Sequence, residues 1–192
     1  IALGAIFAYF LLFSGRITAE LAVQAHFDPL TNLLNRRGFE ERARQELKRA
    51  TRTGSPVSLL MIDANDFKRI NDTWGHQVGD RALQAIANGI RARVRQYDVV
   101  GRLGGDEFAV LLPGLDGDAA AALIPRLLES IAAQPTEHGG RLTVSIGRAS
   151  MESPGDGMVG TGLRQESAEG EMLRRLAKVA DEDLYGVKRT RF

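Results

Sequence analysis

The apolar residues of the chain follow two different spacings, and each spacing predicts one kind of element. In four segments they recur every three or four residues, as on one face of an amphipathic helix. Phe39, Ala43 and Leu47 are an example, in a helix that Asn35 would cap. Four shorter runs have the length and aliphatic content typical of strands. The predicted helices cover residues 35–51, 76–95, 118–133 and 169–188, and the predicted strands cover residues 57–62, 98–102, 108–112 and 141–150.

The order of these elements predicts the fold class. It runs helix, strand, helix, two strands, helix, strand, helix. Gly104 and Gly105 separate the two middle strands, which predicts a hairpin. The run Val57–Ile62 is apolar apart from one serine, which suits a central strand covered on both faces. We therefore expect an α/β (α+β) domain in which helices flank a mixed central sheet.

The first residues, Ile1–Phe13, are apolar and uncharged. They are too few to span a bilayer, which takes about 20 residues. They also lack the basic start and the small-residue cleavage site of a signal peptide. Arg16 follows, and basic residues favour the cytoplasmic side of membrane helices. We expect residues 1–27 to hold the end of a transmembrane helix and a short helical connector, and residues 28–192 to form one domain. A buried helix or a segment introduced for expression is the alternative.

The composition excludes several kinds of site. Lysine plus arginine (25) nearly balance aspartate plus glutamate (24), so there is no global basic field to indicate DNA binding. The absence of cysteine excludes disulfides, thiolate metal sites and cysteine nucleophiles. His26, His76 and His138 show no zinc-ligand spacing. A metal would therefore bind through oxygen, which favours magnesium or a similar hard cation.

Acidic residues stand at the ends of two predicted strands. Asp63 directly follows the apolar run, where a carboxylate is costly unless a cation compensates it. The cap of a following helical turn is the alternative. Asp106 and Glu107 follow the glycine pair, whose residues permit positive φ and close approach of a ligand. An ordinary hairpin turn also uses glycine and aspartate, so this motif alone is ambiguous.

The two acidic turns indicate more together than separately. Adjacent strand residues point to opposite faces, so only one of Asp106 and Glu107 can share the face of Asp63. Carboxylates at the ends of central strands can hold one or two Mg²⁺ ions against a triphosphate. Two-metal phosphoryl transfer uses such an arrangement, in which one ion activates the attacking hydroxyl and the other neutralises the leaving group.

The stretch Arg102–Phe108 (RLGGDEF) is the signature of the GGDEF family of diguanylate cyclases, and the chain resembles that family over roughly residues 26–190. Four further blocks match the family's pattern in the same order. They are Asp28–Thr31 with Asn35–Arg37, then Asp63–Asp80, then Thr143–Gly147, and finally Ala180–Asp181 with Leu184, Tyr185 and Lys188.

The chain departs from the family's pattern at three places. The loop Met151–Glu169 is longer and richer in glycine than is typical of the family. Asn32 replaces a glycine, but asparagine also tolerates positive φ, so we expect little effect. The glycine–arginine pair usual after the family's lysine is missing after Lys188, which puts a second phosphate-contacting arginine in doubt; Arg191 is the candidate replacement.

The resemblance implies a diguanylate cyclase, which condenses two GTP molecules into cyclic di-GMP with release of pyrophosphate. It implies a fold similar to the palm of polymerases and the class III nucleotidyl cyclases, and Mg²⁺ or Mn²⁺ as cofactor. Each domain would bind one GTP and face a second domain in a homodimer, where each 3′-hydroxyl attacks the opposite α-phosphate. Together with the N-terminal segment, it implies a bacterial inner-membrane protein with its catalytic domain in the cytoplasm.

Carried onto this sequence residue by residue, the resemblance implies three functions around one nucleotide. Asp63, the carbonyl of Ala64, Asp106 and Glu107 would hold the metal, and Asp106 would also act as the base. Gly104 and Gly105 would leave room for phosphates and ribose. Phe67 and Lys68 would bind phosphate through backbone N–H groups in a phosphate-binding turn. Lys188 would bind the terminal phosphates, and Asn71 and Asp80 would bind guanine.

Some of these residues have plainer interpretations without the family. Asn71 would be a turn residue and Asp80 a charge on a helix face. With the family, Asp80 would accept hydrogen bonds from the N1 and N2 hydrogens of guanine, a donor pair that adenine lacks.

The resemblance also implies an inhibitory site for the product. Arg95 and Asp98 form an RxxD motif that five residues separate from Gly104. Arginines suit bidentate capture of phosphate or guanine. Arg126 stands where a second arginine of that site can occur. The alternative for Arg95 is a cation that favours the end of its helix.

Two alternatives to an active cyclase remain. One is a non-catalytic receptor that binds cyclic di-GMP through Arg95 and Asp98. The other is a GTP-binding regulatory module paired with a phosphodiesterase domain. Degenerate relatives usually lose the signature acids or Asp63; all are present here, which favours catalysis.

Overall fold

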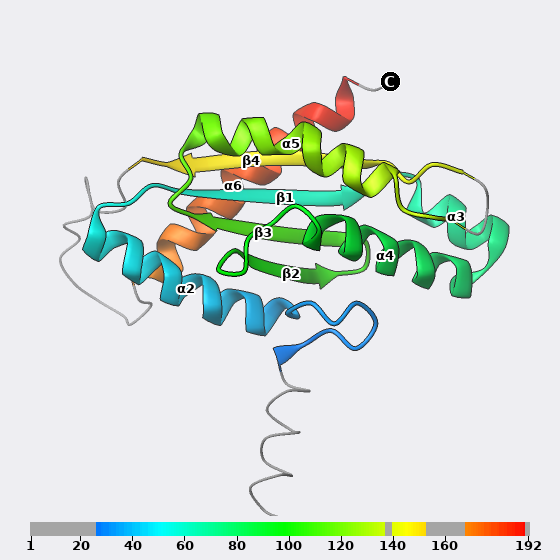
Figure 1. The fold of residues 1–192 in the computed structure, drawn as a ribbon, viewed down its shortest axis with the longest axis horizontal. Coiled ribbons are helices and arrows are strands. Elements are labelled where there is room, and N and C mark those ends of the chain that lie inside the picture. Colours follow the sequence, from blue (N-terminus) through cyan, green and yellow to red (C-terminus); the bar gives the residue numbers. More distant parts are fainter. Residues whose placement is uncertain (1–25, 137–139, 153–167, 191–192) are drawn as a thin grey trace, which may run out of the picture.

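The computed structural model describes residues 26–136, 140–152 and 168–190. Its helices and strands alternate along the chain, apart from one pair of consecutive helices and one pair of consecutive strands (Figure 1). In chain order they are α2 (Arg36–Thr53), β1 (Val57–Ala64), α3 (Phe67–Trp74), α4 (His76–Arg91), β2 (Val99–Gly104), β3 (Glu107–Pro113), α5 (Gly117–Ala132), β4 (Val144–Met151) and α6 (Ala168–Arg189).

The four strands form one sheet in the order β2-β3-β1-β4, and every neighbouring pair is antiparallel. The prediction of a mixed sheet is therefore wrong for these strands. β1 and β2 do run in the same direction, but β3 lies between them, so they form no parallel pair. A single parallel bridge, from Leu34 to Gly101, lies outside the named strands. The strand and helix order from β1 to β4 is that of the ferredoxin-like β-α-β-β-α-β motif, with two helices in the first connection.

Helices cover both faces of the sheet, as predicted. α4 and α5 pack on one face, and α2 and α6 pack on the other (Figure 1). The alternation of side chains along β1 separates the two cores, because successive strand residues point to opposite faces. Leu60 and Ile62 are buried against α4 and α5, whereas Leu59 and Met61 are buried against α2 and α6.

Two boundaries differ from the predicted ones for local reasons, and one helix is not predicted. α4 ends at Arg91 because the chain turns there, and the backbone N–H of Arg95 donates to the Asp98 side chain at 2.6 Å. β4 begins only at Val144, which pairs with Ala64 at the end of β1. The sequence pattern also predicts no helix where α3 lies: the predicted phosphate-binding turn at Phe67 is the first turn of this helix, which is only 8 residues long and has no fully buried residue.

The N-terminal motif matches its prediction closely. The side chain of Asn35 caps α2 by accepting from the backbone N–H of Gly38 at 2.9 Å. Asn32 has φ 53°, so asparagine adopts the left-handed conformation that the family's glycine would adopt there. The predicted transmembrane end and most of the connector, residues 1–25, lie outside the described residues. No helix in the described part of the chain is long and apolar enough to span a membrane.

Close packing of α6 on β4 depends on Gly147. A Cβ atom at this position would overlap the carbonyl oxygen of Ala180 and the backbone nitrogen of Leu184. The next residue, Arg148, donates its backbone N–H to the Asp183 side chain at 2.8 Å. Glycine therefore lets the helix lie directly against the strand, and this contact sets the position of the last turn of α6.

We expect Gly147→Ala to lower the free energy of unfolding by about 1–3 kcal/mol, the usual cost of overpacking a tight contact. The measurement is urea unfolding followed by circular dichroism. Gly186→Ala, on the helix α6 that packs against Gly147, is the matched control, because a Cβ there meets no atom within 4 Å. That variant should be neutral or stabilised by up to about 1 kcal/mol. Equal stabilities of the two variants would show that the α6–β4 contact tolerates a methyl group.

Candidate active site

The pairing of β1 with β3 brings the predicted acids together. Asp63 lies directly opposite Glu107 in the antiparallel register. Residues opposite each other in such a pair point to the same face, with Cβ atoms about 4.5–5.5 Å apart. Glu107 is therefore the signature acid that shares the face of Asp63, a choice the sequence leaves open. This is the face on which α2 and α6 pack, since Leu59 and Met61 of β1 point the same way.

Asp106 lies beside this pair, in the turn between β2 and β3. Its carbonyl oxygen accepts the backbone N–H of Ala64 at 3.1 Å, so the turn is fastened to the end of β1. Gly105 has φ 48°, a conformation that favours glycine. A Cβ at Gly104 or Gly105 would meet no atom within 4 Å, so open space lies next to the turn. Both features agree with the predicted approach of a ligand.

Arg102 stabilises the turn between β2 and β3 through hydrogen bonds to its backbone. Its Nε and Nη2 donate to the carbonyl oxygen of Gly105 at 3.0 and 2.7 Å, and its Nη1 lies 3.2 and 3.1 Å from the two carboxylate oxygens of Asp28. Asp28 also accepts from the backbone and hydroxyl of Thr31 at 2.9 and 2.6 Å. Burial acts to raise the pKa of Asp28, but these hydrogen bonds and the charge of Arg102 together lower it. Sequence reasoning found both residues only as parts of motifs, because no local spacing relates positions so far apart.

Two basic side chains contact the acidic pair. Nζ of Lys188, in the last turn of α6, lies 2.7 Å from Oδ1 of Asp63. Nη2 of Arg36, the first residue of α2, lies 3.7 Å from Oε2 of Glu107. Arg36 also donates from Nε to the carbonyl oxygen of Leu103 at 3.0 Å. The sequence predicts Lys188 at the site, but it marks Arg36 only as part of a motif.

The oxygen atoms gathered here suit a hard divalent cation. No group of three or more His, Cys, Asp or Glu residues in the described part of the chain could hold a metal ion. Mg²⁺, however, is usually bound by one or two carboxylates and takes the rest of its shell from water and phosphate. The facing carboxylates of Asp63 and Glu107, with Asp106 and the backbone of Ala64 adjacent, fit that requirement.

The predicted guanine-binding residues lie on α3 and α4, which pack against each other. Oδ1 of Asn71 is buried and has no hydrogen-bond partner among the described residues. A Cβ at Gly79 would overlap this oxygen, so glycine makes room for it. Asp80, the next residue, is exposed. An unsatisfied buried acceptor beside an exposed carboxylate is a place where a ligand with several N–H donors would gain hydrogen bonds.

The first turn of α3 offers backbone N–H groups. Asp66, at its N-cap, has φ 55° and makes no side-chain capping hydrogen bond. The first N–H groups of a helix have no partner within the helix and favour anions. Phe67 and Lys68 supply those groups here. The loop before them is held by Asn65, which accepts from Ser145 Oγ at 2.7 Å.

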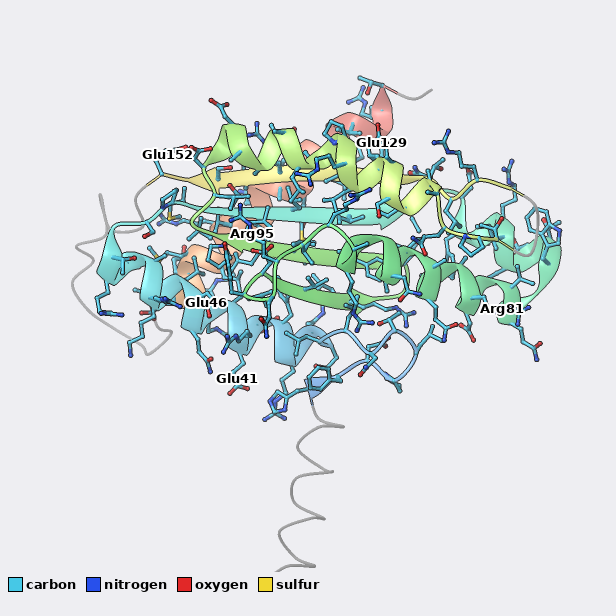
Figure 2. All side chains as sticks on the ribbon, viewed as in Figure 1. Glu41, Glu46, Arg81, Arg95, Glu129 and Glu152 are labelled. Carbon is cyan, nitrogen blue, oxygen red and sulfur yellow. The ribbon has the colours of Figure 1, made fainter. Side chains whose placement is uncertain are left out.

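The RxxD residues lie at the other end of the sheet, before the start of β2 (Figure 2). A groove of about 540 Å³ is lined there by apolar residues, by Asn32 and Gln96, and by the charged residues Arg42, Arg91, Arg95 and Asp98. Oδ1 of Asp98 is buried and has no hydrogen-bond partner among the described residues. Burial raises the pKa of Asp98, although the hydrogen bond and charge of Arg95 oppose the shift. Arg126 is exposed on α5 and is not among the described residues that line this groove.

Comparisons with known proteins show the family to which the chain belongs. The family described as "Diguanylate cyclase, GGDEF domain" matches residues 25–192. Diguanylate cyclase DgcP of Pseudomonas aeruginosa is 39% identical over 165 residues, which are 84% of this chain and 22% of that protein. Response regulator PleD of Caulobacter vibrioides is 38% identical over 169 residues, which are 88% of this chain and 34% of that protein. The chain thus spans about a third or less of the length of these relatives.

A solved structure extends the agreement to three dimensions. The coiled coil and GGDEF domain of DgcB from Caulobacter crescentus, crystallised in complex with c-di-GMP, superposes with a TM-score of 0.77 at 26% identity. The match covers 99% of this chain and 96% of that one. Since the family match runs from the N-terminal motif through the signature to the last helix, the chain belongs to the GGDEF family of diguanylate cyclases.

Proposed function

We propose that this domain condenses two GTP molecules into cyclic di-GMP and pyrophosphate. The observation that carries the proposal is the register that sets Asp63 opposite Glu107, with Asp106 fastened beside them. In the reaction, the 3′-oxygen of one GTP forms a bond to the α-phosphorus of the other. The bond between the α-phosphorus and the bridging oxygen breaks, and pyrophosphate leaves. Two such steps close the ring.

The acidic residues have separate tasks in this proposal. Asp63, Glu107 and the carbonyl of Ala64 would hold a divalent cation, Mg²⁺ or Mn²⁺. When bound, the cation would lower the pKa of the attacking hydroxyl and neutralise charge on the phosphates. Asp106 would accept the proton of the 3′-hydroxyl, since it lies in the turn next to the open space at Gly104 and Gly105.

Recognition of phosphate and guanine would use α3 and α4, the two helices that follow β1 in the chain. Backbone N–H groups of Phe67 and Lys68 would donate to phosphate oxygens, and Lys188 would meet the terminal phosphates. Asp80 would accept from the N1 and N2 hydrogens of guanine, and the buried Oδ1 of Asn71 would accept from the exocyclic amine. Adenine cannot supply that donor pair, so ATP would leave Asp80 unpaired.

Catalysis in this proposal needs a homodimer. One acidic pair and one predicted guanine site occur in the described part of the chain, whereas the reaction joins two nucleotides. Two domains facing each other in an antiparallel arrangement would bring each 3′-hydroxyl to the opposite α-phosphate. Activity per subunit would then rise with protein concentration until the dimer is saturated.

We also propose that cyclic di-GMP inhibits the enzyme at the groove beside Arg95. The support is a cluster of arginines next to Asp98, whose buried Oδ1 could accept from a guanine N–H. β2 runs from this groove directly into the signature turn, so a ligand there could restrain Asp106. Arg126 stays a proposed member of the site, although it lies on α5 and is not among the described residues that line the groove.

The proposed location is the bacterial inner membrane, with the catalytic domain in the cytoplasm, where GTP is found. The support is the uncharged apolar run Ile1–Phe13 followed by Arg16. Separation of membranes from the soluble fraction of cells expressing the full-length gene would test it. Recovery of the protein only in the soluble fraction would contradict it.

The purified domain should form cyclic di-GMP from GTP and Mg²⁺, detected by chromatography. Asp63→Ala should abolish detectable product, and Asp106→Ala should reduce the rate by about 10²–10⁴-fold, as expected for loss of a general base. Asp118→Ala, which removes an exposed carboxylate from α5 on the other face of the sheet, should retain wild-type activity. Near wild-type rates from both active-site variants would rule out the proposed metal site. GTP or cyclic di-GMP binding without turnover in the wild type would favour the receptor alternatives.

Asp80→Ala should lower kcat/KM for GTP by about 10- to 100-fold, the value of hydrogen bonds to a charged group. It should also reduce the preference for GTP over ATP. Gly79→Ala should raise KM for GTP as well, because the new methyl group overlaps Oδ1 of Asn71 without removing a polar group. Asp118→Ala again controls for the lost charge. Unchanged selectivity in both variants would place the guanine site elsewhere.

Arg95→Ala should raise the inhibition constant of cyclic di-GMP by about 5- to 150-fold, the usual range of allosteric coupling. The constant is measured by titrating product into the cyclase assay. Arg93→Ala is the matched control, because Arg93 is exposed two residues earlier and is not among the described residues of the groove. An identical constant in Arg95→Ala and wild type would mean that product acts at the active centre.

A further inference from the structure

The two carboxylates of the acidic pair each contact a cation from a different helix. Asp63, with only 16% of its side chain exposed, pairs with Lys188 of α6 at 2.7 Å. Glu107, with 52% exposed, pairs more loosely with Arg36 of α2 at 3.7 Å. The pair that would hold a divalent cation thus has a basic residue on each side. The inference below rests on the proposed function, since it concerns the same metal and nucleotide site.

Lys188 and a divalent cation cannot share Asp63 without strong repulsion. Charges a few ångströms apart interact strongly where water is partly excluded, and one of these two is double. A largely buried carboxylate, however, needs some compensating cation. Because Lys188 contacts Oδ1, a cation bound by the same carboxylate would lie within a few ångströms of the ammonium group, so Lys188 and the metal compete for Asp63.

Once a nucleotide binds, its phosphate oxygens offer Lys188 an alternative partner to Asp63. Its ammonium group is a point charge with three donors on a flexible stem, and 39% of its side chain is exposed. Phosphate oxygens would therefore attract it away from Asp63. Arg36 differs because its Nε is anchored on the carbonyl oxygen of Leu103 at 3.0 Å. It would keep its place beside the hairpin and shift only its Nη2 contact.

We propose that Lys188 and Arg36 are exchangeable counter-ions of the acidic pair, which a divalent cation displaces and the phosphates of the nucleotide take up. Arg36 is a positioning residue in this scheme. Before nucleotide arrives, both side chains oppose metal binding; after it arrives, they assist nucleotide binding. Lys188 has the larger effect, because its contact is shorter and its partner less exposed, whereas exposed pairs are weak and screened by salt.

The first test measures Mn²⁺ binding to the nucleotide-free protein, from the paramagnetic resonance signal of unbound Mn²⁺. Lys188→Met should bind Mn²⁺ about tenfold more tightly than wild type, within the range of about 5- to 150-fold usual for coupled equilibria. Lys178→Met is the matched control. It removes the same charge from the same helix, where Lys178 is 78% exposed and lies 4.0 Å from Glu182. Its affinity should stay within about twofold of wild type, the scale of a weak surface pair.

The second test measures nucleotide affinity, which the same substitution should lower although it raises Mn²⁺ affinity. With saturating Mn²⁺, Lys188→Met should bind 3′-deoxy GTP, which cannot react, more weakly than wild type by calorimetry. A purely structural role of Lys188 would weaken both ligands or neither. Arg36→Gln should also raise Mn²⁺ affinity and lower nucleotide affinity, and both changes should be smaller and should decrease with added salt. Its control is Arg44→Gln on the same helix, where Arg44 pairs with Glu40 at 3.1 Å. Melting temperatures establish that each variant is folded.

The outcomes separate this inference from the proposed function. If Lys188→Met and Lys178→Met change Mn²⁺ affinity equally, net charge explains the effect and the inference is wrong. If Asp63→Asn removes Mn²⁺ binding but Lys188→Met leaves it unchanged, the metal site stands and the exchange is wrong. If Asp63→Asn leaves Mn²⁺ binding intact, or the wild type binds no Mn²⁺ with or without nucleotide, both the metal site and the exchange fail.

Discussion

The hydrogen-bonded register between β1 and β3 is the constraint on which the site depends. A slip of one residue would turn every side chain of one strand to the opposite face. Here both faces are buried, with Leu60 under α4 and α5 and Leu59 under α2 and α6, so a slip would disrupt two cores at once. The same register sets Asp63 opposite Glu107. Packing of apolar side chains in the middle of the strands thus fixes the distance between carboxylates at their ends.

The two helices on one face of the sheet, α2 and α6, pack on the core and also carry Arg36 and Lys188 to the acidic pair. α6 lies close to β4 because Gly147 lacks a side chain, and its last turn carries Lys188 to Asp63. α2 begins directly after its Asn35 cap with Arg36, which reaches the hairpin. A substitution in the packing between helix and sheet would therefore move a counter-ion of the acidic pair. On this face of the sheet, the contacts that stabilise the fold therefore also position the charges around the acidic pair.

Two buried acceptors that have no hydrogen-bond partner among the described residues support the two proposed ligand sites. Oδ1 of Asn71 lies between α3 and α4, near the end of β1 that carries the acidic pair, and Oδ1 of Asp98 lies at the opposite end of the sheet. Leaving a buried acceptor unsatisfied costs about 1–3 kcal/mol. A ligand with N–H donors would remove that cost at either place. β2 begins next to Asp98 and ends in the signature turn, so one strand runs from the groove to the candidate active site.

The amino-acid sequence by itself determined the local structure and the kind of chemistry. Apolar spacing located eight of the nine helices and strands described here and missed only α3. Local signals also located the cap at Asn35 and the covered strand β1, because those features depend on neighbours a few residues away. The motif residues Asp63 and Asp106 indicated a metal site for the same reason. Only the tertiary structure decided that β3 separates β1 from β2, that Glu107 faces Asp63, and that Arg36 and Lys188 meet these acids. Those partners are far apart along the chain, and no local spacing can encode which strand pairs with which; the choice is made by burying both faces of the sheet at once.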